Sequence, residues 1–247
     1  MTQPTDYADA RQDIAPTGRL RVALNMGNPV LTSSKLNIDG PAGVTIDLAN
    51  EFATRLGAKV DFQEYPTAAD ALRAVVSGAA DVGFMAIDPG RATGIHFTGA
   101  YVEIQGSYVV PANSSILRNE DVDAPGVTLV VGQASAYDLY LSRHITQATL
   151  VRVPLSEQVI DDMVREGHAA GAGVRQQLQG EMVRYPDVRL LDGGFMTIRQ
   201  ACIIPADRSD ASKAIVDNFI EQARSSGFVE EALRRHGIEG AQIAARP

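Results

Sequence analysis

Cysteine and tryptophan are scarce in this chain, which has 247 residues, one cysteine (Cys202) and no tryptophan. A single cysteine excludes an intramolecular disulfide and any cysteine metal cluster. Cys202 lies in the apolar run 198–204, so we expect a small buried thiol there. The chain also lacks an uninterrupted apolar run of about 18 residues, the length that would predict a membrane-spanning helix.

Basic residues are outnumbered by acidic ones, 22 against 30, which gives a formal net charge of -8. A general nucleic-acid binder needs a basic surface to displace counterions, so this balance argues against nucleic-acid partners. An anionic ligand is still compatible, because the local charge of a pocket decides its binding. The composition, 45% hydrophobic and 21% charged, indicates a globular protein with a substantial core.

A secretory signal is not recognisable in the first eighteen residues, which lack a basic start and an apolar middle. Either the protein stays in the cytoplasm or a signal has been removed, so the sequence leaves the localisation open.

Motifs for metals, cofactors and covalent catalysis are also missing. The four histidines are scattered, without a pair at metal-ligand spacing. There is no Gly-x-Ser-x-Gly elbow and no Walker loop, and the glycines at 171 and 173 lack the third glycine of a dinucleotide loop. We therefore expect no metal, no cofactor and no catalytic residue.

Short apolar runs alternate with helical patterns along most of the chain. In the first half we expect strands at 20–24, 60–62 and 82–87 and helices at 45–56 and 68–76. This order implies a parallel sheet with helices on both faces. The second half repeats the alternation: we expect strands at 127–131, 149–153 and 169–172, helices at 135–145, 156–166, 174–184 and 209–226, and an extended segment at 195–204.

The simplest architecture is a pair of α/β lobes, the first of them discontinuous. We expect lobe 1 to comprise 18–108 and 198–247 and lobe 2 to comprise 109–197, with 1–17 as a flexible lead-in. Two extended crossings would then form a hinge. A ligand is expected in a cleft bordered by the carboxyl ends of both sheets.

The segment from 71 to 101 (ALRAVVSGAADVGFMAIDPGRATGIHFTGAY) runs helix, turn, buried strand and a short loop that ends in Arg91. A charge directly after an apolar strand is expected at the rim of a core, where a ligand could meet it. The order of parts resembles the ligand-binding core of bacterial solute-binding proteins of the polar amino acid type, family 3. There a Gly-x-x-Asp turn, a strand, an arginine loop and a Phe-Ser/Thr-x-x-Tyr segment follow one another, as at 78–81, 82–87, 88–91 and 97–101 here.

The resemblance extends from about 18 to 237. It implies a two-lobe, type II periplasmic-binding-protein fold in which Arg91 holds a ligand carboxylate. The segment 131–138 (VGQASAYD) resembles the second-lobe turn that meets the ligand, which brings in Ser135, Ala136 and Tyr137. The resemblance also implies that the protein is a monomer. If it is exported, the implied partner is an ABC permease, to which it delivers its ligand.

Two positions depart from the family pattern. Ala86 stands where amino-acid binders usually carry Ser or Thr, so only its backbone could help to hold a carboxylate. Arg175 stands where those binders place an Asp for the α-ammonium, and an arginine would repel a cation. The ligand then either lacks an ammonium at this place or carries a second anionic group there.

Each candidate residue also has a structural interpretation. Arg91 either forks onto a carboxylate or is a surface arginine. Ser135 either contacts the ligand or only caps a helix with Asp138, and the amides that follow it attract anions in either case. Asn25 and Asn28 either donate to a ligand or form a turn. For the remaining two, Tyr137 lines the pocket or packs on its lobe, and Arg175 binds a second anion or lies on a solvated helix face.

The leading functional hypothesis is a binding protein, not an enzyme, for a small carboxylate, either an amino acid or an organic acid. The second is a lyase on the same fold resembling cyclohexadienyl dehydratase, which acts on prephenate or arogenate. It needs a positioned acid, and Glu166 and Asp138 are the nearest candidates. The third is a cytoplasmic ligand sensor or scavenger.

Overall fold

The computed structural model describes residues 7–33 and 40–245 and divides the chain into two compact units. Unit 1 comprises Met1–Glu103 and Arg199–Pro247, and unit 2 comprises Ile104–Ile198. The chain therefore leaves unit 1 after Glu103 and returns to it at Arg199. The sequence placed these crossings after residues 108 and 197.

The sheet of unit 1 has the strand order β2-β1-β3-β9-β4. β1 is parallel to β2 and β3, and β9 is antiparallel to β3. A two-residue strand near the C-terminus, β10, pairs with β4 at Val102 and Glu103. The bounds are β1 (Arg19–Asn25), β2 (Lys59–Tyr65), β3 (Val82–Ala86), β4 (Ile95–Pro111), β9 (Met196–Pro205) and β10 (Gln242–Ile243).

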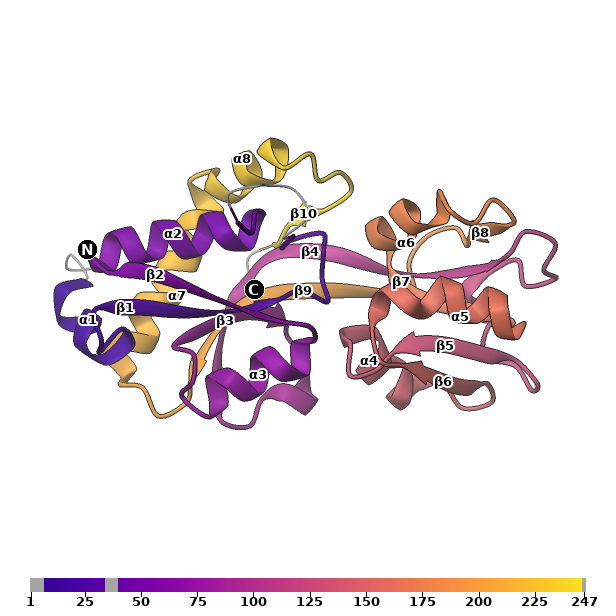
Figure 1. Cartoon of the computed structure of the whole chain (residues 1–247), viewed down its shortest axis with the longest axis horizontal. Coiled ribbons are helices and arrows are strands. Elements are labelled where there is room, and N and C mark those ends of the chain that lie inside the picture. The colour runs from indigo at the N-terminus through magenta and orange to yellow at the C-terminus, as the bar shows by residue number, and fades with distance from the viewer. Residues whose placement is uncertain (1–6, 34–39, 246–247) are drawn as a thin grey trace. The chain divides into compact units, whose positions relative to one another are not determined.

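Helices α2 and α3 lie on opposite faces of this sheet (Figure 1). α2 ends at Gly57, which adopts the left-handed conformation (φ 63°) that glycine tolerates best. α3 begins at Thr67, whose hydroxyl accepts a hydrogen bond from the Asp70 amide at 3.1 Å. The helices of the unit are α1 (Tyr7–Ile14), α2 (Val44–Leu56), α3 (Ala68–Val76), α7 (Asp210–Ser225) and α8 (Phe228–Arg235).

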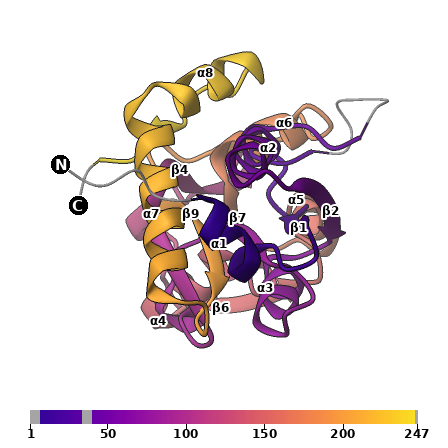
Figure 2. The same ribbon diagram turned by 90° about the vertical axis from the view of Figure 1, so that its left-hand side faces the viewer.

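The flexible lead-in expected for 1–17 is wrong for Tyr7–Ile14, which form helix α1. Ala10 and Ile14 are four residues apart and both buried, so this otherwise polar helix has a narrow apolar stripe. With it α1 packs against α2 and α7 (Figure 2). The first six residues of the lead-in lie outside the described residues.

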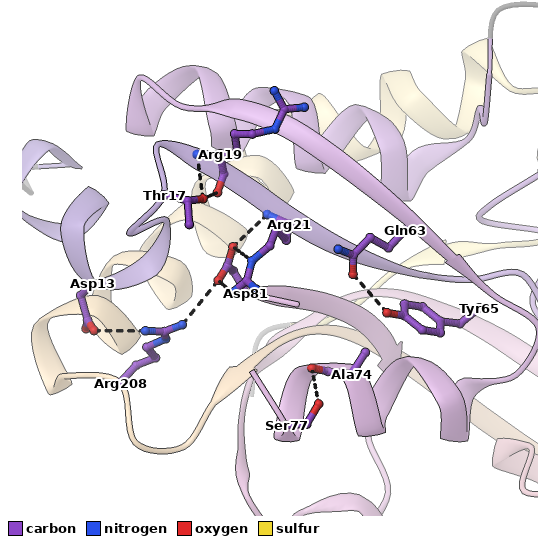
Figure 3. A network of polar contacts seen from close by, with 10 residues as sticks. All are labelled: Asp13, Thr17, Arg19, Arg21, Gln63, Tyr65, Ala74, Ser77, Asp81 and Arg208. Carbon is purple, nitrogen blue, oxygen red and sulfur yellow. Dashed lines mark hydrogen bonds and ion pairs between the residues drawn. The ribbon is translucent and has the colours of Figure 1, made fainter. Parts of the chain in front are cut away.

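A buried carboxylate, Asp81, joins three segments of unit 1 (Figure 3). Asp81 is fully buried and accepts bonds from Arg21 through the backbone N (2.9 Å), Nε (3.1 Å) and Nη2 (2.6 Å). Arg208 lies 3.5 Å from Asp81 and 3.6 Å from Asp13 of α1. The aspartate of the Gly-x-x-Asp turn therefore ties β1 to the turn before β3 and, through Arg208, to α1.

The strands of unit 2 follow in the order β4-β7-β5-β6, with β8 paired to β4. β5 is parallel to β6 and β7, and β7 is antiparallel to β4. β7 is built from small residues because its neighbours approach closely: a Cβ on Gly173 would lie 2.9 Å from Leu178 of α6. The bounds are β5 (Thr128–Gly132), β6 (Thr149–Val153), β7 (Ala170–Val174), β8 (Val188–Leu190), α4 (Ala136–His144), α5 (Val159–Glu166) and α6 (Arg175–Met182).

The alternation predicted from the sequence is therefore present in both units, with element ends shifted by a few residues. The clearest difference is β4, a single strand of 17 residues that is not among the strands expected from the sequence. Over the described residues, none of the helices combines the length and apolar character needed to cross a membrane.

Candidate functional site

Unit 1 gathers three of the predicted ligand-binding residues at one edge of its sheet. β1 and β3 are parallel, with Val22 opposite Val82, so their carboxyl ends lie at the same edge. Asn25 is the last residue of β1 and Ala86 the last of β3. Arg91 follows β3 in a short 3-10 helix, η1 (Pro89–Arg91). Ligands of open α/β sheets bind outside this edge.

The side chain of Arg91 is buried, with an exposed fraction of 4%. The turn before it is fixed by Asp88, whose Oδ1 accepts from the Gly90 amide at 2.8 Å. Nη1 of Arg91 donates to the carbonyl of Ala86 at 3.2 Å. Burial lowers the pKa of Arg91 to about 10, although the negative charge of Asp88 acts in the opposite direction. The surface-arginine interpretation is therefore wrong, and the guanidinium remains charged at neutral pH.

Asn25 and Asn28 form the turn that their spacing predicted. Oδ1 of Asn25 accepts from the backbone amide of Gly27 at 3.1 Å, and the backbone amide of Asn28 donates to the backbone carbonyl of Asn25 at 3.3 Å. Asn28 is 8% exposed, and its Oδ1 has no hydrogen-bond partner among the described residues. Contact of either asparagine side chain with a ligand stays a prediction.

Unit 2 places the other candidates at the carboxyl edge of its own parallel strands. Leu129 of β5 lies opposite Ala170 of β7, so Gly132 and Val174 end these strands at one edge. Helices α4 and α6 begin there, with Ser135 before the first and Arg175 at the start of the second.

Ser135 is the N-cap of α4, as its spacing from Asp138 predicted. Its Oγ accepts from the Asp138 amide at 3.0 Å, and Asp138 Oδ2 accepts from the Ala134 amide at 2.8 Å. Asp138 is buried and also binds Nε of Arg152 at 3.0 Å. Ala134 has a positive φ (56°), unusual for a residue with a side chain, and the bond to Asp138 helps to hold it. The capping role of Ser135 is confirmed. Contact of Ser135 and Ala136 with a ligand stays a prediction.

The Tyr137 side chain lies inside unit 2. It is 2% exposed, and its hydroxyl donates to Oγ of Ser156 at 2.8 Å. Burial raises the pKa of Tyr137 to about 12, and the bond with Ser156 opposes this rise. Of the two interpretations, packing on the lobe is the one that describes the ring, so a ligand would meet this residue through its backbone.

Arg175 is tied to the backbone of its own unit. Its Nη1 donates to the Gly193 carbonyl at 3.0 Å, to Oγ of Ser107 at 3.3 Å and to the Leu191 carbonyl at 3.4 Å. Arg175 is only partly buried, so whether it binds a second anion stays a prediction. Ser107, fully buried on β4, was missed by the sequence analysis, and a lone serine in an apolar run was its only signal.

Groups of three or more His, Cys, Asp and Glu able to hold a metal ion do not occur within residues 7–33 and 40–245. Glu166, an acid considered for the lyase hypothesis, is half exposed and pairs with Arg165 at 2.8 Å. The carboxylate of Asp138 serves the helix cap.

Solved structures of amino-acid-binding proteins are similar to this chain. The amino acid ABC transporter substrate-binding protein of Streptococcus pneumoniae, bound to L-arginine, is 21% identical, with a TM-score of 0.77 over 90% of this chain and 96% of that one. The cysteine-binding protein of Campylobacter jejuni is 19% identical, with a TM-score of 0.76 over 93% and 92%. An ancestral amino-acid-binding protein described as a precursor of cyclohexadienyl dehydratase is also 19% identical, with a TM-score of 0.75 over 91% and 97%.

At these identities the likeness establishes the fold, which is that of the type II periplasmic binding proteins. A search of curated proteins gives no match. The family model for bacterial extracellular solute-binding proteins, family 3, matches residues 20–238. The chain belongs to this family.

Proposed function

We propose that this solute-binding protein captures a small carboxylate, an amino acid or an organic acid, with Arg91 as the anchor of the carboxylate. The observation that carries the proposal is a buried guanidinium at the carboxyl edge of β1 and β3. Desolvation is what depresses its pKa, so a carboxylate that pairs with it relieves part of that cost. One charge-assisted hydrogen bond of this kind contributes about 1.5–3 kcal/mol.

Unit 2 has a candidate anion-binding position of its own. The backbone amides at the start of α4, from Ser135 to Tyr137, attract negative charge. In this proposal the protein works as a monomer and delivers its ligand to an ABC permease.

The two candidate acids, Asp138 and Glu166, are already engaged in other bonds, which favours binding over lyase chemistry. A dehydratase needs a carboxylic acid placed to give a proton to the leaving group. Asp138 is engaged by the Ala134 amide and by Arg152, and Glu166 forms an ion pair on α5. Neither acid is positioned by the unit for a reacting group.

The test begins with a thermal-shift panel of amino acids, monocarboxylates and dicarboxylates, followed by isothermal titration with those that stabilise the protein. We expect Arg91→Ala to weaken binding by about tenfold or more, the loss of one charge-assisted bond. Arg165→Ala, which removes an exposed arginine of α5, is the matched control and should leave the affinity unchanged. Equal affinities of wild type and Arg91→Ala, with both folded by circular dichroism, would remove Arg91 from the site.

A further inference from the structure

Gln200 is a polar residue in the apolar part of β9. Cys202 and Ile204, which lie on the same face of this strand as Gln200, are each 1% exposed. Gln200 itself is 5% exposed, yet its side chain has no hydrogen bond to a described residue. Neither of its amide atoms is among the described polar atoms that are enclosed without a partner, so both remain accessible to a small ligand. Burial of a carboxamide without a partner is unfavourable, so core packing alone does not account for this residue.

Ala86 lies directly opposite Gln200 on the neighbouring strand β3. The backbone amide of Ile87 donates to the backbone carbonyl of Arg199 at 2.8 Å, so these two residues form a hydrogen-bonded pair of the antiparallel ladder. Ala86 and Gln200 are then the adjacent non-hydrogen-bonded pair, whose Cα atoms are about 4.5 Å apart and whose side chains project from the same face. Ala86 contributes only a methyl group, so Gln200 supplies the hydrogen-bonding side chain of this pair.

Arg91 meets the end of β3 from the other side. In a non-hydrogen-bonded pair the backbone carbonyl points away from the partner strand, so the carbonyl of Ala86 is directed away from β9. Nη1 of Arg91 donates to this carbonyl at 3.2 Å. Arg91 and Gln200 therefore flank the carboxyl end of β3, and neighbouring strands are about 4.8 Å apart. A carboxylate bound to Arg91 is shorter than this separation, so the ligand atom that faces Gln200 belongs to the next part of the molecule.

From this geometry we propose that Gln200 is a specificity-determining residue of unit 1. Its carboxamide hydrogen-bonds a hydroxyl or amino group on the carbon next to the carboxylate that Arg91 holds. This inference rests on the proposed function, because it assigns the substituent of the same ligand. A carboxamide both donates and accepts, so it serves either substituent. A ligand without the substituent leaves the buried carboxamide unpaired, which is how such a position rejects an unsubstituted acid.

A purely structural role of Gln200 is the competing explanation. Gln200→Leu and Gln200→Met keep a side chain of similar size on this face of β9 and remove only the carboxamide. The matched control is Gln222→Leu on α7, where the exposed carboxamide accepts from Nη1 of Arg55 at 2.8 Å. This control removes a structural hydrogen bond of unit 1 without changing the carboxyl edge of its sheet.

The experiment titrates wild type, Gln200→Leu, Gln200→Met, Gln222→Leu and Arg91→Ala calorimetrically with three matched sets of acids. Each set contains an amino acid, the hydroxy acid and the unsubstituted acid of the same carbon skeleton. The sets are L-alanine, L-lactate and propionate; L-aspartate, L-malate and succinate; and L-phenylalanine, L-phenyllactate and hydrocinnamate. Melting curves followed by circular dichroism establish that each variant is folded.

We expect wild type to bind at least one amino or hydroxy acid about tenfold or more tightly than the unsubstituted acid of its set. Gln200→Leu and Gln200→Met should abolish this difference and leave the affinity for the unsubstituted acid unchanged, and Gln222→Leu should preserve it. Arg91→Ala should weaken every acid of the set. The comparison of the amino acid with the hydroxy acid identifies the preferred substituent.

Arg91-dependent binding without a preference for the substituted acids would overturn this inference and leave the proposed function intact. A preference that survives in Gln200→Leu and Gln200→Met would also overturn it. Equal weakening of all three acids of a set by these variants would show that Gln200 acts through the structure of the unit, which contradicts the inference as well. If no carboxylate binds at all, both proposals fail.

Discussion

Replacing Asp81 by asparagine tests the account of unit 1 most directly. The substitution is nearly isosteric, and its Oδ1 can still accept from the Arg21 amide at the position now 2.9 Å away. It removes the charge that faces Nε and Nη2 of Arg21 and lies 3.5 Å from Arg208. The amide nitrogen of the new side chain would face guanidinium donors, where no acceptor remains.

The magnitude follows from the burial of the three side chains. Asp81 is fully enclosed, while the side chains of Arg21 and Arg208 are 26% and 18% exposed, so both arginines keep part of their hydration. Breaking a fully buried ion pair costs about 3–5 kcal/mol, and an exposed one contributes about 0–1 kcal/mol. We expect Asp81→Asn to lower the free energy of unfolding of unit 1 by about 2–4 kcal/mol, between these limits but nearer the first.

Urea denaturation followed by far-ultraviolet circular dichroism measures this change, with linear extrapolation to water. Asp161→Asn, at an exposed ion pair on α5, is the matched control and should change the free energy of unfolding by less than about 1 kcal/mol. If Asp81→Asn is as mild as this control, the buried network does not hold β1, the turn before β3 and α1 together.

Two further predictions concern α1 and acid stability. Ile14→Ala should lower the free energy of unfolding by about 2–5 kcal/mol in urea denaturation, because Ile14 is 1% exposed. Gln12→Ala, on the exposed face of α1, is the control and should be nearly neutral. Equal effects of the two substitutions would mean that α1 does not pack on unit 1. In unit 2, bonds from the amides of Ala148, Gln147 and Thr146 lower the pKa of Asp123 from 3.8 to about 2. The pKa of Asp123 is lower in the folded than in the unfolded state. The stabilisation that this carboxylate contributes is therefore present above the unfolded pKa and is lost as pH falls from about 4 to about 2. Asp123→Asn should therefore destabilise unit 2 at neutral pH and have a flatter acid limb in pH-dependent urea melts; parallel wild-type and variant limbs would contradict this.

Much of the fold could be predicted because local signals coincide with the element ends. Gly57 stops α2, the Thr67 hydroxyl starts α3, and Ser135 with Asp138 starts α4, each where the sequence placed it. Each signal acts within a few residues, so these helix ends can be predicted without knowing which segments pack against the helices.

The misses arise where distant segments decide the outcome. The lead-in hides α1 because only Ala10 and Ile14 mark its buried face, and their partners lie on α2 and α7. The crossing at Glu103 is unmarked because β4 is continuous there, with no proline or change of composition. Ser107 gains its role only from the Arg175 guanidinium and the Gly193 carbonyl, which are far from it along the chain.

Arginines were the hardest residues to interpret from sequence, and the reason is chemical. The chain has nineteen arginines and three lysines, so a lone arginine carries little information. A guanidinium has five N–H donors and can serve structure and binding at once. What separates the cases is which nitrogens are engaged: Arg21 gives Nε and Nη2 to Asp81, and Arg189 gives the same two atoms to backbone carbonyls. Arg175 gives Nη1 alone, to two backbone carbonyls and the Ser107 hydroxyl, so its contacts within the unit differ from those of both other arginines.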